Sequence, residues 1–290
     1  MSTTLSGEAD RTRAAAASAR HSRRRRVSYD AKKHTTQVGI AGLALAALVY
    51  GTLGDAEWGR VLARLPLLLT GNGTGWPITG GFLLNVFMSV VSMAIATVLG
   101  TIMAAGLLSS NGLVRVPAFL AMNFLRNAPW IVLLFSMLYL LPFQVSMFGI
   151  TVSFPPVVKA IIGLSLPTAA NLAEVVRGAV QSIHAGQWES ARSLGYSTSA
   201  IYARVILPQA LRRMIPGYMN LYALLMIATA LATVTGVQEV ITLLRTSLAM
   251  ESEGVLIYFY LAVIFMFFAY CYPIALLARR IERNAKGDAI

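Results

Sequence analysis

The sequence predicts an all-α protein that crosses a membrane about six times, and three observations lead to this fold class. The chain of 290 residues is 57% hydrophobic and only 12% charged, whereas soluble domains carry about 25% charged residues. The charges are also unevenly placed, and a helix that crosses a bilayer core needs roughly 20 apolar residues. Blocks with few or no charges recur along the whole chain, at 38–54, 82–108, 130–143, 157–170, 219–237 and 255–277.

The basic residues lie mainly on one side of these predicted spans. The formal net charge is +12, and the segment 1–36 includes the arginine run 23–26. If the N-terminus is cytoplasmic, six spans place most of the Lys and Arg residues inside, as the positive-inside rule expects. A basic chain can also bind nucleic acid. Because the charge here adjoins apolar spans, we expect contact with lipid headgroups and no nucleic-acid binding.

The first part of the chain predicts a tail and an anchor. Residues 1–36, rich in Ala, Ser and Arg, predict a disordered cytoplasmic tail. Residues 37–80 predict a retained anchor helix and a periplasmic segment, within which 58–69 predicts a short amphipathic helix at the interface. A cleaved signal peptide fits less well, because the basic region is long and no small-x-small cleavage site follows it.

The predicted core spans residues 81–280, and a short cytoplasmic tail, 281–290, follows it. The third span runs outward and carries Arg126 and Pro129, and the segment 144–154 lies outside. The fourth span enters at Pro155, the fifth leaves after Pro216, and the sixth brings the C-terminus back inside. The one cysteine, Cys271, falls in the last span, so neither a disulfide framework nor a cysteine metal site is predicted.

A polar segment at about 184–208 interrupts the apolar blocks. Four residues recur at a spacing of three and give one apolar stripe on a helix. Gly195 follows as a natural left-handed helix end, and Ser197 can cap a second short helix, which we expect to stop at Pro208. By itself, this pair of helices joined by a glycine bend fits an amphipathic linker at the membrane interface as well as it fits a functional element. The stripe residues are Ala185, Trp188, Ala191 and Leu194.

The order of residues in this segment resembles a known motif. Glu189-Ser190-Ala191, then Gly195, then the ending ILP resemble the EAA loop of the permease subunits of ATP-binding cassette (ABC) importers. The surrounding AEVVRGAVQSIHAGQWESARSLGYS and VILPQALRRMIPGYMN, and FLRNAPWIVLL earlier in the chain, are similar to permeases for polar amino acids of the histidine/glutamate/arginine type. The resemblance covers about residues 80–280.

This resemblance implies the transmembrane domain of a type I importer in a bacterial inner membrane. Its implied partners are a cytoplasmic ABC ATPase dimer, a second permease subunit and a periplasmic solute-binding protein. The chain has no phosphate-binding G-x-x-x-x-G-K-[ST] loop, so we expect no enzyme activity and no cofactor in it, with ATP and Mg on the partner ATPase. No metal site is expected. The residues implied in ATPase coupling are Trp188, Glu189, Ala191, Leu194 and Gly195.

Polar residues at membrane depth usually have a partner or a function. Arg126, Asn171, Glu174 and Thr229 are therefore candidates for a substrate path. Two alternatives stay open: Glu174 and Arg177 can pair at i, i+3, and buried Asn and Thr can join helices by hydrogen bonds.

The chain departs from the family pattern in the fifth span. Ile227 and Ala230 are apolar where the family often has Lys and Ser. The substrate class therefore stays open between polar amino acids and related compounds such as opines. A secondary transporter or channel remains the alternative function, although inverted repeats are not visible. A non-transporting membrane scaffold is a third.

Overall fold

The computed structural model describes residues 40, 42, 56–72, 79–147, 150–251 and 253–287. The chain divides into two units, Met1–Trp58 and Gly59–Ile290, and almost all of the described residues belong to the second. The predicted basic tail lies outside the described residues, as does the first predicted span apart from residues 40 and 42.

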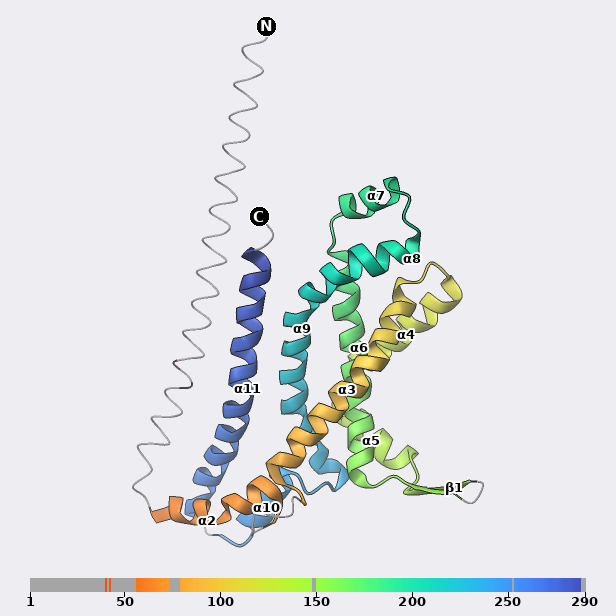
Figure 1. Ribbon diagram of the computed structural model, residues 1–290. Helices are drawn as coiled ribbons and strands as arrows, with labels where there is room; N and C mark the ends of the chain where they lie inside the picture. The colour runs from red at the N-terminus through yellow and green to blue at the C-terminus, as the bar shows by residue number, and fades with distance from the viewer. Residues whose placement is uncertain are drawn as a thin grey trace. The chain divides into compact units, whose positions relative to one another are not determined.

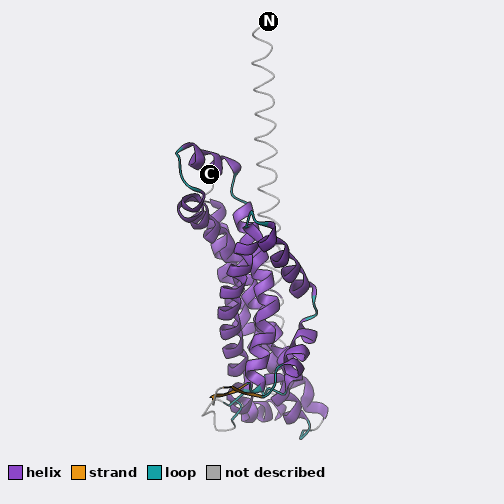
Figure 2. Cartoon of the chain, turned by 90° about the vertical axis from the view of Figure 1, so that its right-hand side faces the viewer, coloured by secondary structure: helices purple, strands orange, loops and turns teal. Residues whose placement is uncertain are grey.

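Helices form nearly all of the described chain, as the composition predicts (Figures 1 and 2). The one strand pair among the described residues is an antiparallel hairpin of β1 (Gln144–Met147) and β2 (Ile150–Ser153). The helices are α2 (Ala56–Thr70), α3 (Gly81–Leu108), α4 (Gly112–Asn127), α5 (Trp130–Leu140), α6 (Pro156–Gln181), α7 (Ala185–Ser193), α8 (Thr198–Ile201), a π turn (Tyr202–Ile206), α9 (Leu207–Ala228), a 3-10 segment (Thr229–Thr235), α10 (Val240–Leu248), a 3-10 turn (Glu253–Val255) and α11 (Leu256–Gly287).

Four described helical segments are long and apolar enough to cross a membrane. They are α3, α6, the run Thr198–Thr235 and the part Leu256–Glu282 of α11. The helices α4 and α5 meet the same criterion together, which gives a fifth span if the pair is counted as one. The predicted class, a helical polytopic membrane protein, is confirmed, and a helix, α2, is present where 58–69 predicts one.

The third predicted span is broken rather than continuous. Its halves α4 and α5 meet at an angle of 105°. Pro129 stands at the start of α5, and Ala128 before it has the extended ψ of 135°. A residue before proline is disfavoured in the helical region, so α4 ends here. Because the change of direction depends on what each half packs against, the proline alone did not reveal it.

Lys159, in the first turn of α6, is buried although its side chain is charged. Its side chain has 0% exposure and its ammonium group donates to the carbonyls of Leu138 and Leu141, at 3.0 and 2.6 Å. The same group lies 3.6 Å from the centre of the Phe143 ring. The carbonyls at the end of α5 have no partners within that helix, and a cation is stabilised there. Lys159 thus joins α6 to α5.

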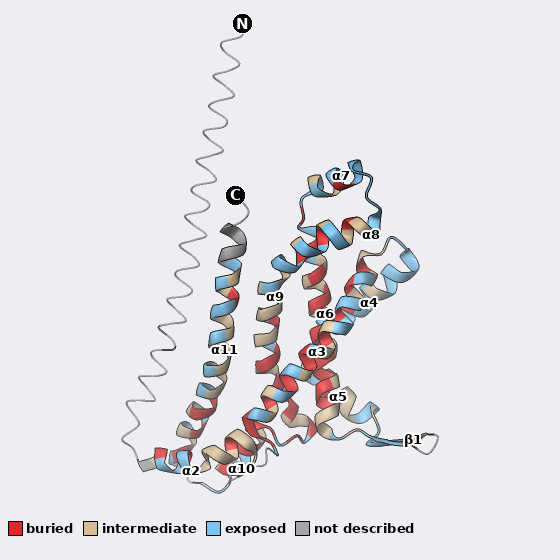
Figure 3. Ribbon diagram, viewed as in Figure 1, coloured by how far each residue is buried: buried red, intermediate tan, exposed pale blue. Residues whose placement is uncertain are grey.

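The core of the second unit forms around α6, which packs against α3, α4, α5 and α9. Two thirds of the apolar window of α6 are buried (67%), against 11% in α11, and Figure 3 shows this contrast. The crossing of α3 and α6 is close because of Gly100. A Cβ atom there would lie 2.7 Å from the carbonyl oxygen of Ala169. Small residues allow membrane helices to approach in this way.

The two ends of the bundle formed by α3, α6 and α9 carry different elements (Figure 1). At one end are α7 and α8, and at the other are α10 and the strand hairpin. The second end is tied together by contacts between distant segments. Gly81 donates its backbone N–H to Gln238 at 2.9 Å, and Arg60 and Arg64 of α2 lie 3.5 and 3.8 Å from Glu251.

Candidate functional site

The segment 184–207 forms a helical hairpin whose bend is the predicted one. Gly195 has φ +76°. Its N–H bonds to the Arg192 carbonyl at 2.9 Å, and the Tyr196 N–H bonds to the Ala191 carbonyl at 3.2 Å. These two bonds define a Schellman motif, which satisfies carbonyls at a helix end and requires a left-handed residue. Glycine adopts that conformation without steric cost, so the sequence fixes where α7 ends.

Side chains close the starts of both hairpin helices. Ser197 accepts a hydrogen bond from the Ala200 N–H, as predicted for the start of α8. His184, a cap not predicted from the sequence, accepts through Nδ1 from the Gly186 N–H at 3.1 Å. These caps pair N–H groups that have no partner within the helix. Local residue chemistry is therefore enough to form the hairpin.

Apolar packing holds the hairpin on the ends of α6 and α9. Ala191 is 3% exposed and belongs to a cluster with residues of α6, α8 and α9, among them Val180, Ile201 and Ala210. Trp188 meets the Tyr202 ring edge to face at a centroid distance of 5.1 Å, an arrangement that favours aromatic pairs. The Arg213 guanidinium of α9 also donates to the Ser182 carbonyl. The apolar cluster therefore fixes the hairpin to the ends of these two helices.

Two of the predicted coupling residues point into solvent. Leu194 is 75% exposed, and Glu189 is exposed as well. The left-handed turn that follows Leu194 removes it from the packed face. Ala185 is exposed as well, so only Trp188 and Ala191 of the predicted stripe are packed. Trp188 is half-buried inside the hairpin. The hairpin thus has an inner face formed by Trp188 and Ala191 and an outer face that carries Glu189 and Leu194.

The second helix of the hairpin does not stop at Pro208, contrary to the sequence expectation. The chain continues from α8 through the π turn into α9, with Pro208 in the first turn of α9. The Leu207 N–H bonds to the carbonyl of Tyr202, five residues back. A proline in a helix lacks an N–H and its ring clashes with the carbonyl four residues earlier. The wider π turn accommodates both effects, so the hairpin joins α9 without a break.

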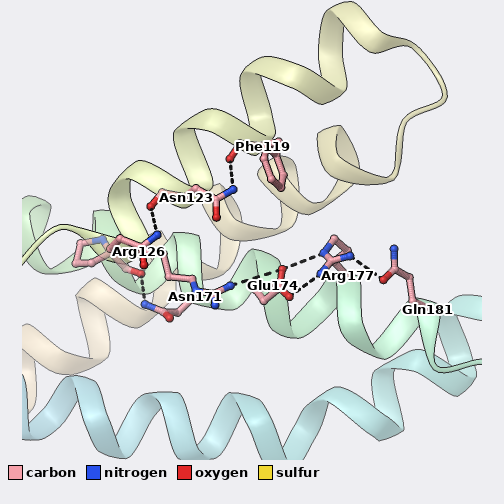
Figure 4. Close-up of polar contacts among 9 residues, drawn as sticks. Phe119, Asn123, Arg126, Asn171, Glu174, Arg177 and Gln181 are labelled. Carbon is pink, nitrogen blue, oxygen red and sulfur yellow. Dashed lines mark hydrogen bonds and ion pairs between the residues drawn. The ribbon is translucent and has the colours of Figure 1, made fainter.

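Three of the four predicted substrate-path residues lie together, as Figure 4 shows. Glu174 receives two bonds from Arg177, at 2.9 and 2.6 Å, so the predicted pairing is confirmed. Arg126 of α4 reaches the same carboxylate at 3.8 Å. Asn171, one turn before Glu174 on α6, donates to the Pro167 carbonyl at 2.8 Å. Two guanidinium groups thus face one carboxylate, which leaves this partly exposed cluster with one net positive charge.

The fourth predicted residue, Thr229, lies in a different place. It has 0% exposure, donates to the Met226 carbonyl at 2.6 Å and accepts from the Asn85 amide at 3.0 Å. This geometry favours the alternative that a buried Thr joins helices by hydrogen bonds. Asn85 and the buried Glu239 next to it were missed by the sequence argument.

Glu239 caps α10 from within the protein. Its carboxylate accepts from the N–H groups of Ile241 and Thr242, at 2.9 and 2.7 Å. It also accepts from the Asn85 amide at 3.2 Å and the Thr242 hydroxyl at 3.0 Å. Burial raises the pKa of Glu239, and these hydrogen bonds act in the opposite direction. The sequence signal for the cap was an acidic residue just before the apolar run of α10.

The comparisons with known proteins point to one family. The family model described as "Binding-protein-dependent transport system inner membrane component" matches residues 96–287. A probable amino-acid permease protein of Bacillus subtilis, YxeN, is 33% identical over 234 residues, which are 78% of this chain and 95% of the relative. The histidine/lysine/arginine/ornithine transport system permease protein HisM of Escherichia coli is 30% identical over 223 residues, 76% and 91% of the two chains.

A solved structure shares the fold. It is described as the crystal structure of an amino acid ABC transporter with histidines, and it aligns with a TM-score of 0.64 at 22% identity. The alignment covers 78% of this chain and 97% of the other. The residues matched by the family model, 96–287, include both the hairpin and the polar cluster around Glu174.

Proposed function

The chain belongs to the family of binding-protein-dependent transport system inner membrane components, and on this premise we propose that its α7–α8 hairpin transmits ATP-driven movement from a separate ATPase. The chain is the permease subunit of an ABC importer. The observation that carries the proposal is the hairpin itself, which is fixed to α6 and α9 on one face and open to solvent on the other. A lever needs both properties.

The two faces of the hairpin suggest different roles for the predicted coupling residues. Glu189 and Leu194 on the outer face are the contacts for the ATPase, one polar and one apolar. Trp188 and Ala191 on the inner face brace the hairpin against Tyr202 and the buried cluster. Gly195 holds the angle between the helices. Force on Leu194 then reaches α9 through packed side chains rather than through a loose loop.

The cargo we propose is a polar amino acid or a related compound. The relatives above transport amino acids by name, and all amino acids carry a carboxylate. The cluster of Arg126, Glu174 and Arg177 has one net positive charge and is partly exposed at membrane depth, where a charge interacts more strongly than in water. A carboxylate beside Arg126 complements it, and Asn171 adds an amide on the same face of α6.

The proposed assembly follows from the family and from the charges of the chain. Its partners are an ATPase and a solute-binding protein, and a second permease subunit, identical or related, completes the path. We place both termini in the cytoplasm, because most of the basic residues then lie inside. The hairpin lies on that side and α10 on the periplasmic side, where the binding protein docks.

The test is the ATPase activity of the intact assembly. A tagged chain is purified from native membranes with its associated subunits and reconstituted into vesicles. Hydrolysis and amino-acid uptake are then measured with loaded binding protein, scanned across amino acids. We expect Leu194→Asp to abolish ATPase association, because it puts a charge on the apolar contact.

A matched variant separates docking from general damage. Thr198→Asp adds the same charge to the same hairpin, at a helix N-terminus where an anion is favourable, and should keep hydrolysis and uptake. If the Leu194 variant retains a fully active ATPase, the proposed role of the hairpin as the ATPase contact fails. If the wild type takes up no amino acid, the proposed cargo fails.

A further inference from the structure

Three fully buried polar side chains join the end of the bundle opposite to the hairpin, and the transport mechanism above assigns them no role. Asn85 lies in the second turn of α3, Thr229 at the end of α9, and Glu239 just before α10, and each has 0% exposure. Along the chain, Thr229 and Glu239 are 144 and 154 residues away from Asn85. Buried polar groups of this kind are costly unless they are fully hydrogen-bonded.

Asn85 is the centre of this network. Its amide nitrogen donates to Thr229 at 3.0 Å and to Glu239 at 3.2 Å, while its oxygen accepts the Val240 N–H at 3.1 Å. The amide nitrogen therefore bridges the end of α9 and the residue that caps α10, and the amide oxygen bonds to the first residue of α10. Among the described residues no basic group lies in ion-pair contact with Glu239, so the carboxylate depends on these neutral donors. No single element can move away without leaving buried groups unpaired.

The network is linked to the hairpin by one continuous helical run. The segment Thr198–Thr235 includes α8, the π turn, α9 and Thr229. Along this run α9 is bonded to α3 at two further places. Tyr222 pairs with Ser89 at 3.2 Å and Tyr218 with Thr97 at 3.0 Å.

The order of these pairs shows that α3 and α9 run antiparallel and are joined along much of their length. Residue numbers rise on α3 as they fall on α9. Tyr222 also bonds to Tyr270 of α11 at 2.7 Å. Hydrogen-bonded networks of this kind are contiguous elements through which two sites can be coupled, provided that both sites bias the same element.

We propose that Asn85, Thr229 and Glu239 are positioning residues that make α10 follow α9, so that binding-protein docking at the α10 end reaches the hairpin. The inference rests on the proposed function, because it takes the hairpin as the ATPase contact. It adds the residues that complete the path on the far side. Coupling of binding sites is reciprocal, so the ATPase state also acts on α10 through the same three side chains.

The test compares basal ATPase activity with activity stimulated by loaded binding protein. Thr229→Val keeps the shape of the side chain and removes the acceptor for Asn85. Glu239→Gln keeps the shape and replaces one acceptor oxygen by a donor. Both variants should keep basal hydrolysis, because the hairpin is unchanged, and should lose stimulation by a factor on the order of ten, a typical allosteric coupling.

Two further variants distinguish coupling from packing. Thr168→Val makes the same change at another position of 0% exposure, where the hydroxyl bonds only within its own helix, to Leu164 at 2.7 Å. This variant should keep full stimulation by loaded binding protein, although it should lose about as much thermal stability as Thr229→Val. Thr229→Ser retains the hydroxyl and should restore stimulation.

The outcomes separate this inference from the function beneath it. Normal stimulation in both Thr229→Val and Glu239→Gln would refute the network as a coupling element and leave the proposed function standing. Absence of stimulation in the wild type would refute the proposed function itself. Should Glu239→Gln not reach the membrane, Thr229→Val decides, since it removes only one hydroxyl.

Discussion

Replacing Gly195 tests the hairpin with the least disturbance elsewhere, because only the backbone opposes the change. No heavy atom lies within 4 Å of a Cβ atom placed at this position, so a new side chain meets no clash. The φ of +76° is the whole obstacle. An L-residue in the left-handed region costs about 1–2 kcal/mol, and a β-branched one is a genuine outlier there.

The size of the effect follows from this strain. One to two kcal/mol changes an equilibrium by a factor of about 5–30. Gly195→Ala should shift the conformational equilibrium of the hairpin by this factor toward states without the two Schellman hydrogen bonds. Gly195→Val should shift it further. Leu194 then loses its fixed place relative to α9. We expect uptake per ATP hydrolysed to fall for Ala by up to about 5–30-fold, with normal amounts of protein in the membrane.

The assay measures hydrolysis and uptake in the same reconstituted vesicles, with two controls. Gly195→Asn should stay near wild type, because asparagine tolerates a positive φ better than most residues. Gly178→Ala adds the same methyl group to open space within helix α6, where alanine is preferred to glycine. If Gly195→Val transports with wild-type efficiency, the bend does not transmit movement and the reasoning is refuted.

Three further results are expected. Asn171→Leu should alter uptake while thermal stability falls by only about 1 kcal/mol; unchanged uptake would remove it from the substrate path. Lys159→Met should lower the free energy of unfolding by about 1.5–3 kcal/mol per lost charged hydrogen bond, and a melting curve in detergent equal to wild type would contradict this. Burial raises the pKa of Glu239, so its contribution to the free energy of unfolding should be complete below the ordinary carboxyl pKa of about 4.3. This contribution should be lost as the pH rises through the raised pKa. The melting temperature of Glu239→Gln should lack this dependence on pH.

Features set by neighbouring residues could be predicted from the sequence. The hairpin depends on Gly195 at a helix end and on Ser197 at a helix start, and both act over a few residues. The Glu174–Arg177 pair follows from helical spacing in the same way. Long apolar blocks likewise predict the helical membrane fold, because every backbone group in a bilayer must be paired within the segment.

Features that depend on distant partners could not be predicted. Asn85 and Thr229 each look like an isolated polar residue until folding brings the segments together. Lys159 looks like a surface charge unless the end of α5 is known to lie beside it. Pro208 predicts the end of a helix. The hydrogen bond from the Leu207 N–H to the Tyr202 carbonyl shows that the helix instead continues past Pro208. In each case the missing information is three-dimensional.

The buried ammonium group of Lys159 has a consequence for the biogenesis of the protein. A lysine that enters the apolar part of a bilayer without partners costs up to about 2.5–3.5 kcal/mol on insertion scales. The carbonyls of Leu138 and Leu141 that satisfy Lys159 belong to the preceding helix and its end, so they leave the ribosome first. The translocon can therefore release α5 and α6 into the lipid as one folded helical pair, whereas α6 on its own would carry an uncompensated charge at its leading turn.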